Sequence, residues 1–149
     1  MNPNAASYKK AAILSASPER LILMLYDGAL DAMQRAKEGF KIEDIRLRNE
    51  TISNNLIKAQ NIFAELQRAL KMESKAEFAQ NMYGLYDFYT TKLNEANFKK
   101  EEGPIDIVMN LFKQIRDAWA EMLTKADVKV RPAANPYAHR GGTGISLRA

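Results

Sequence analysis

Hydrophobic residues recur at steps of three and four along most of this chain, and that spacing marks one face of an α-helix. The pattern predicts four helices, at residues 18–38, 42–70, 77–96 and 104–123. No stretch alternates between apolar and polar residues with a period of two, as a half-buried strand does. The sequence therefore predicts an all-α fold, and four amphipathic helices joined by short loops favour an antiparallel four-helix bundle.

The expected helix ends carry residues suited to those positions. The hydroxyl of Ser17 can cap a helix that starts at Pro18. Proline suits the first helical position, because the N–H that it lacks would have no partner within the helix there. Gly39 suits the left-handed position that often ends a helix. Residues 74–77, with the sequence Ser-Lys-Ala-Glu, are typical of a capping box, and Pro104 opens the last helix.

The chain divides into three segments, of which residues 17–126 form the predicted bundle. Residues 1–16 hold a weakly amphipathic helical stretch that is too short to be stable alone, so we expect it to dock on the bundle. Residues 127–149 contain proline and glycine and form a predicted flexible tail. The net charge of +4 belongs to this end, because the chain before Lys125 holds 17 basic and 17 acidic residues. Nucleic-acid binding is therefore not predicted.

Each predicted helix has a stripe of residues that we expect to form the core. In the second helix these are Ile45, Ile52, Leu56, Ala59, Phe63, Leu66 and Leu70. In the third they are Phe78, Met82, Leu85, Tyr89, Leu93 and Ala96. In the fourth they are Ile105, Val108, Met109, Phe112, Ile115, Trp119, Met122 and Leu123.

Some apolar surface is left over once the core is assigned. In the first helix, Ile22, Tyr26 and their neighbours form an arc of roughly 220° at 100° per residue, which is more than one packing partner covers. The second cover could be the N-terminal segment, a second copy of the chain or a client protein.

Two further bands lie away from the predicted stripes. Ile57, Asn61 and Ala64 fall on the far side of the second helix, and Ala79, Tyr83 and Tyr86 fall to one side of the third. An apolar band edged with asparagine is typical of a groove that accepts a partner helix. The alternative is scattered surface residues with tyrosines half-buried at the edge of the bundle.

The residues that catalysis or metal binding would need are missing. The chain has no cysteine and a single histidine, His139, which lies in the tail, and it has no Glu-x-x-His pair for a metal inside a helix bundle. The longest apolar run, Leu21–Tyr26, is too short to cross a membrane, and the first residues do not form a signal peptide. We therefore expect a cytoplasmic protein that is not an enzyme, has no cofactor or metal and does not insert into membranes.

The block SPERLILMLYDGA, residues 17–29, resembles the opening signature of the FliS family of bacterial flagellin export chaperones. Further positions agree with the family in order and spacing, namely Tyr8, residues 58–60, residues 81–88 and residues 115–119. Two features depart from it, since the connection after the second helix lacks glycines and Ala69-Leu70 replaces an acidic residue.

The resemblance implies a chaperone that binds the disordered C-terminal segment of flagellin in the cytoplasm, prevents premature polymerisation and keeps flagellin competent for export. It also implies that the segment around Tyr8 docks on the bundle and is displaced by the client. Flagellar export-gate components are further candidate partners. The candidate partner-binding residues are Tyr8, Ile22, Tyr26, Ile57, Asn61, Ala64, Ala79, Tyr83 and Tyr86.

A different class of function stays open beside the chaperone. The wide apolar face of the first helix also suits a non-enzymatic scaffold or adaptor that homodimerises through that helix, and a weak homodimer is a further candidate partner. An enzyme is a distant third hypothesis. Titration with a flagellin C-terminal peptide distinguishes the first two, because a scaffold dimer would change its mass with concentration and would not bind the peptide.

Overall fold

The computed structural model describes residues 3–70 and 77–130, and every regular element in these ranges is an α-helix. The predicted all-α helical bundle is confirmed. The helices are α1 (Pro3–Ser15), α2 (Pro18–Gly39), α3 (Ile45–Ala69), α4 (Glu77–Lys99) and α5 (Gly103–Val130). The predicted capping box and almost all of the predicted tail lie outside the described residues.

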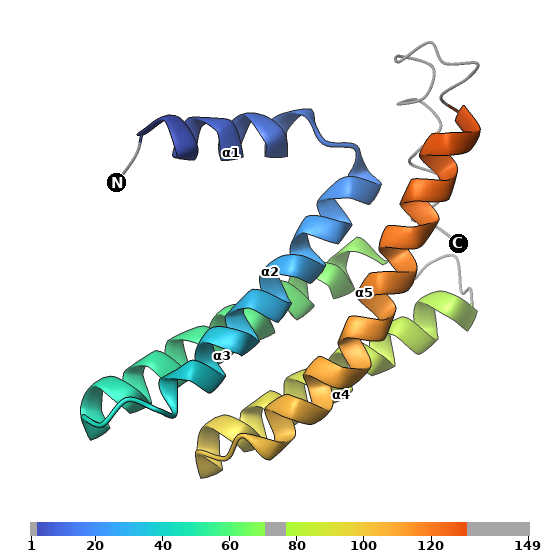
Figure 1. Cartoon of the computed structure of the whole chain (residues 1–149). Helices are drawn as coiled ribbons and strands as arrows, with labels where there is room; N and C mark the ends of the chain where they lie inside the picture. Colours follow the sequence, from blue (N-terminus) through green and yellow to red (C-terminus); the bar gives the residue numbers. More distant parts are fainter. Residues whose placement is uncertain (1–2, 71–76, 131–149) are drawn as a thin grey trace.

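Helices α2 to α5 form the bundle (Figure 1). Within the bundle, α2 packs against α3, α3 against α4 and α4 against α5, and α5 closes the ring by packing against α2. Successive helices alternate in direction, as expected for helices joined by short connections. Residues 40–44 connect α2 to α3 and residues 100–102 connect α4 to α5.

Aromatic rings from all four bundle helices meet at the centre of the core. Tyr26 of α2, Phe63 of α3, Tyr89 of α4 and Phe112 of α5 are each at most 3% exposed. Their ring centroids lie 5.1 to 5.5 Å apart in tilted or edge-to-face pairs, a favourable arrangement for aromatic side chains. The core stripes predicted for the second and fourth helices supply Phe63 and Phe112, so their central positions are confirmed.

Side-chain caps explain where α2 and α3 begin. The Ser17 hydroxyl accepts a hydrogen bond from the Arg20 backbone N–H at 3.2 Å, and Pro18 takes the first helical position as predicted. Asp44 caps α3 by accepting from the Leu47 N–H at 3.1 Å. Because of this cap, α3 begins three residues later than predicted, and Ile45, expected in the core, is 62% exposed in its first turn.

Gly39 does not take the predicted left-handed conformation, since none of the described glycines has a positive φ. It is the last residue of α2 and is buried where α2 meets α3. A Cβ at this position would lie 3.1 Å from Thr51 Cγ2 and 3.2 Å from Ile52 Cγ1. Gly39 is therefore needed for the close approach of the two helices and not for a special turn.

Helix α4 buries four residues of its predicted core stripe, Met82, Tyr89, Leu93 and Ala96, but its first half is turned from the predicted orientation. Phe78 and Leu85, expected in the core, are 49% and 37% exposed, whereas Ala79 and Tyr86, expected in the outer band, are 4% and 2% exposed. Both sets have helical spacing, so periodicity alone could not choose between them. Tyr86 can be buried because its hydroxyl has a hydrogen-bond partner in Tyr26 of α2.

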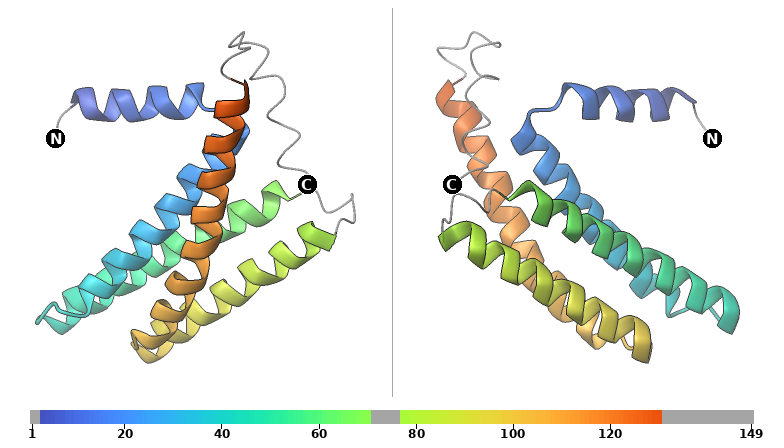
Figure 2. Two further views of the ribbon diagram at one scale, coloured as in Figure 1. Left: turned by 45° about the vertical axis from the view of Figure 1, so that its right-hand side comes forward. Right: turned by 180° about the vertical axis from the view of Figure 1, so that it is seen from behind.

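Helix α1 leads away from the bundle beyond the start of α2, as the views in Figures 1 and 2 agree. Tyr8 and Leu14 on this helix are 78% and 76% exposed. Lys9 and Ile13 border a pocket together with residues of α2, but Tyr8 and Leu14 are exposed, so the docking of residues 1–16 on the bundle stays a prediction.

Candidate functional site

Helices α3 and α4 are joined by a row of side-chain hydrogen bonds along their outer seam. In the middle of the row, the Gln60 amide of α3 donates from Nε2 to the Thr90 carbonyl at 3.2 Å and to Asn94 Oδ1 at 2.7 Å. One glutamine thus holds both the main chain and a side chain of α4. Because neither contact is deeply buried, the seam is polar and lies close to solvent.

Further contacts between the two helices lie seven residues away along α3 in each direction. Gln67 donates to the Tyr83 carbonyl at 3.1 Å and to Asp87 Oδ1 at 2.9 Å. At the other end, Asn97 Nδ2 donates to Ser53 Oγ at 3.3 Å. We call these three sets of contacts the seam ladder. Their regular seven-residue spacing fixes the register of α3 against α4, since a slip by one turn would break all three.

Exposed apolar side chains stand beside the seam ladder. Ile57 and Tyr83 are 46% and 39% exposed, Asn61 is exposed and Ala64 is half-buried. Ile57, Asn61 and Ala64 follow one another at steps of four and three on the outer side of α3, and the Tyr83 backbone is part of the ladder. We use the name α3–α4 groove for the surface along the two helices on which these four residues lie. Four of the nine predicted residues thus lie along the seam between α3 and α4.

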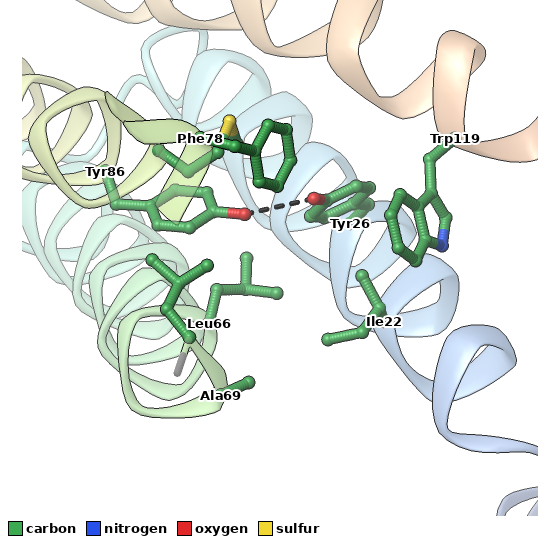
Figure 3. Close-up of a pocket in the computed structure, with 9 residues that line it drawn as sticks. Ile22, Tyr26, Leu66, Ala69, Phe78, Tyr86 and Trp119 are labelled. Atoms are coloured by element: carbon green, nitrogen blue, oxygen red, sulfur yellow. Dashed lines mark hydrogen bonds between the residues drawn. The ribbon is translucent and has the colours of Figure 1, made fainter. Parts of the chain in front are cut away.

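Ile22, Tyr26 and Tyr86 lie elsewhere, around a small pocket at the end of the bundle where α2 begins (Figure 3). Phe78 and Trp119 complete its rim, and the Tyr26 and Tyr86 hydroxyls are hydrogen-bonded across it at 3.0 Å. Burial raises the pKa of both hydroxyl groups, so both stay neutral and able to share this bond. These three residues are core residues that border a pocket and are not part of an open groove.

The start of α2 is tied to α5 beside this pocket. Trp119 Nε1 donates to the Glu19 carbonyl oxygen at 2.9 Å, and the Trp119 ring meets Tyr26 edge-on at 6.1 Å between centroids. The Glu19 side chain is 1% exposed, and neither of its carboxylate oxygens has a hydrogen-bond partner. Trp119 therefore helps to set the position of α2.

The predicted residues fall into four places and not into one site. Ala79 is buried in α4, and Tyr8 stands on α1 away from both the groove and the pocket. The premise that Ala79 and Tyr86 lie outside the core is wrong, because the rotation of α4 buries them.

Sequence reasoning missed a second apolar surface, on the opposite edge of α4. Its half-exposed members are Phe78, Leu85 and Phe88 of α4 and Ile107 and Leu111 of α5. Phe88 and Ile107 belong to none of the predicted stripes, which was a signal that apolar surface remained. Phe78 and Leu85 gave no such signal, since they fit a core stripe.

Neither metal ligands nor a membrane span is found in the described parts of the chain. No three histidine, aspartate or glutamate side chains there lie close enough to hold a metal ion. The helices found at residues 3–70 and 77–130 include none that is long and apolar enough to cross a membrane.

Fold and surface together define an α-helical bundle with half-exposed apolar side chains beside a hydrogen-bonded helix seam, which places the chain in the class of α-helical bundle proteins. The family model described as "Flagellar protein FliS" matches residues 1–126, and the chain belongs to the FliS family. Its relatives include the flagellar secretion chaperones FliS of Bacillus subtilis, 34% identical over 82% of this chain and 86% of that protein, and of Salmonella typhimurium, 36% identical over 78% and 84%. The chain is thus a flagellar export chaperone and not an enzyme.

A solved structure supports the fold independently. A crystal structure of a flagellar chaperone from bacteria matches with a TM-score of 0.63 and 17% identity, over 83% of this chain and 99% of that one. At this low identity the likeness concerns the fold alone.

Proposed function

We propose that the chain binds the C-terminal segment of flagellin in the cytoplasm, prevents its premature polymerisation and keeps it competent for export. The observation that carries the proposal is the α3–α4 groove, where Ile57 and Tyr83 stay 46% and 39% exposed beside a rigid ladder. Membership of a family of flagellar secretion chaperones supports a flagellar protein as the client.

The physical basis of binding is folding of the client on the chaperone. A disordered amphipathic segment loses conformational entropy when it becomes helical, so it needs a preformed surface that buries its apolar side chains. The α3–α4 groove offers such a surface, because the seam ladder holds both walls in register without help from the client. Asn61 at the rim supplies a polar edge that can orient the bound helix.

Binding of this kind explains how polymerisation is prevented. A client segment wrapped in helical form on the chaperone cannot pair with other subunits. Release then falls to the export apparatus, so export-gate components are the further partners of this proposal. Tyr8, on a helix that stands outside the bundle, is positioned to contact either the client or such a partner.

The test is a calorimetric titration of the full chain with a peptide of the flagellin C-terminal segment, followed by circular dichroism. We expect saturable binding with a gain of helix beyond the sum of the two components. Tyr83→Ala should weaken binding and leave the melting temperature nearly unchanged, whereas Tyr86→Ala should lower the melting temperature because Tyr86 is in the core. Absence of binding at millimolar peptide would contradict the proposal.

A further inference from the structure

One charged side chain on the α3–α4 groove has no partner of opposite charge among the described residues. Asp87 of α4 is exposed and accepts a hydrogen bond at Oδ1 from Gln67 Nε2 at 2.9 Å, but it forms no ion pair within the described parts of the chain. The nearby charges on α3 are different, since Glu65 and Arg68 pair with each other at 2.8 Å. Asp87 therefore leaves one negative charge uncompensated on this surface.

The seam ladder holds the Asp87 carboxylate in place. The same Gln67 amide also donates to the Tyr83 carbonyl at 3.1 Å, so the main chain of α4 fixes the glutamine. A carboxylate has two oxygens and can accept up to about four hydrogen bonds. Because Gln67 bonds to Oδ1, the second oxygen of Asp87 remains open to a donor from outside the chain. A cation that reaches this oxygen would need no rearrangement of the groove.

Apolar side chains lie on both sides of Asp87 along the axis of α4. Tyr83, one turn before it, is 39% exposed, and Phe98, three turns after it, is 90% exposed. At 100° per residue, these three residues fall within an arc of about 60° on the helix. The neighbouring Asn97 donates to Ser53 of α3 at 3.3 Å, so the turn that carries Phe98 is anchored to the same seam.

A surface of this kind suits one chemical class of helix. From Tyr83 to Phe98 it extends about 22 Å at 1.5 Å per residue, which is the length of a helix of about 15 residues. The apolar side chains of such a helix would cover Ile57, Tyr83 and Phe98. A cation among them would meet the Asp87 carboxylate, whereas an acidic side chain at the same place would be repelled.

We infer that the α3–α4 groove selects client helices that carry an arginine or lysine among their apolar residues, and that Asp87 recognises this cation. The inference rests on the proposed function, because it names the chemistry of the helix that this groove binds. It adds a determinant of specificity to a mainly apolar surface. Attraction of a basic side chain and repulsion of an acidic one both act through this single carboxylate.

Two designed peptides test the inference without depending on flagellin. Both are amphipathic helices of about 15 residues with a leucine face. They differ in the central residue of that face, which is arginine in one peptide and glutamate in the other. By calorimetric titration of the full chain, we expect the arginine peptide to bind about tenfold more tightly than the glutamate peptide.

Substitutions of Asp87 show whether this carboxylate causes the preference. In Asp87→Lys the order of the two peptides should reverse. Asp31→Lys is the matched control, because it makes the same change of charge at a 57% exposed position on α2, which lies across the ring from α4. It should keep the preference for arginine.

The neutral variant Asp87→Asn completes the test. It keeps an oxygen that can accept from Gln67, so it should melt at nearly the same temperature as the original chain and lose most of the preference. An unchanged preference in Asp87→Lys, or no difference between the two peptides on the original chain, would overturn the inference. The proposed function would fail by a different result, since it is tested by titration with the flagellin peptide.

Discussion

At the scale of single residues, Lys100 stands out because it has φ 54° in the connection that ends α4. This left-handed conformation suits glycine and is unfavourable for residues with a Cβ. The Glu101 N–H reaches back to the Ala96 carbonyl at 3.1 Å, so the turn also completes the end of α4. Lys100 offsets part of the strain by donating from Nζ to the Asn97 carbonyl at 2.8 Å.

Lys100→Gly is expected to raise the free energy of unfolding by about 0.5–1 kcal/mol, because glycine adopts a positive φ without strain. Lys99→Gly, in the last turn of α4, is the matched control and should lower stability by a similar amount. Urea unfolding of the three proteins measures both changes. A loss of stability in Lys100→Gly would show that the Nζ contacts outweigh the backbone strain.

At the scale of helices, we expect the seam ladder to stabilise the packing of α3 against α4, although its side chains lie close to solvent. Each glutamine makes two hydrogen bonds to α4. Gln60→Ala and Gln67→Ala are each expected to lower the free energy of unfolding by about 1 kcal/mol. Gln80→Ala, at an exposed position on α4, should change it little. Equal effects of all three in chemical unfolding would mean that the ladder contributes nothing.

The helix scale also shows how far the sequence could predict the structure. Spacing located the four bundle helices and most of their core, because apolar periodicity reflects burial directly. It did not set the rotation of α4, since the stripe through Phe78 and Leu85 and the stripe through Ala79 and Tyr86 are equally regular. The observed rotation buries Tyr86, whose hydroxyl is hydrogen-bonded to that of Tyr26, 60 residues away, and periodicity within one helix cannot reveal such a contact.

The candidate site was predictable in part for the same reason. Ile57, Asn61 and Ala64 could be placed on the outside of a helix because α3 has one clear core stripe. The seam ladder was not predicted, because glutamine and asparagine side chains give no periodic apolar signal. The orientation of α1 depends on two residues, Ala16 and Ser17, and their conformation follows from packing as well as from Pro18.

At the scale of the whole molecule, the buried tyrosines make stability depend on alkaline pH. Burial raises the pKa of Tyr26 and Tyr86, and it raises that of Tyr89 to about 12, above the unfolded value near 10. A group whose pKa is raised on folding gives its full stabilisation below the unfolded pKa. That stabilisation is lost as the pH rises from about 10 through the folded value.

We therefore expect nearly constant stability up to about pH 9.5 and a steep loss between about pH 10 and pH 12, of about 1.4 kcal/mol per buried tyrosine per pH unit. Thermal melts across this range measure it. Tyr89→Phe should make the loss less steep, and Tyr8→Phe, at an exposed position, should not. The same slope in all three proteins would mean that the buried tyrosines do not cause the loss.

The central claim, that the α3–α4 groove binds the flagellin C-terminal segment, is tested most directly by two matched substitutions. Ile57 in the groove and Ile107 on the opposite surface are 46% and 44% exposed, so they differ in place and hardly in exposure. By calorimetric titration with the flagellin peptide, Ile57→Asp should weaken binding about tenfold or more and Ile107→Asp less than about twofold. Equal losses, or a larger loss in Ile107→Asp, would contradict the account.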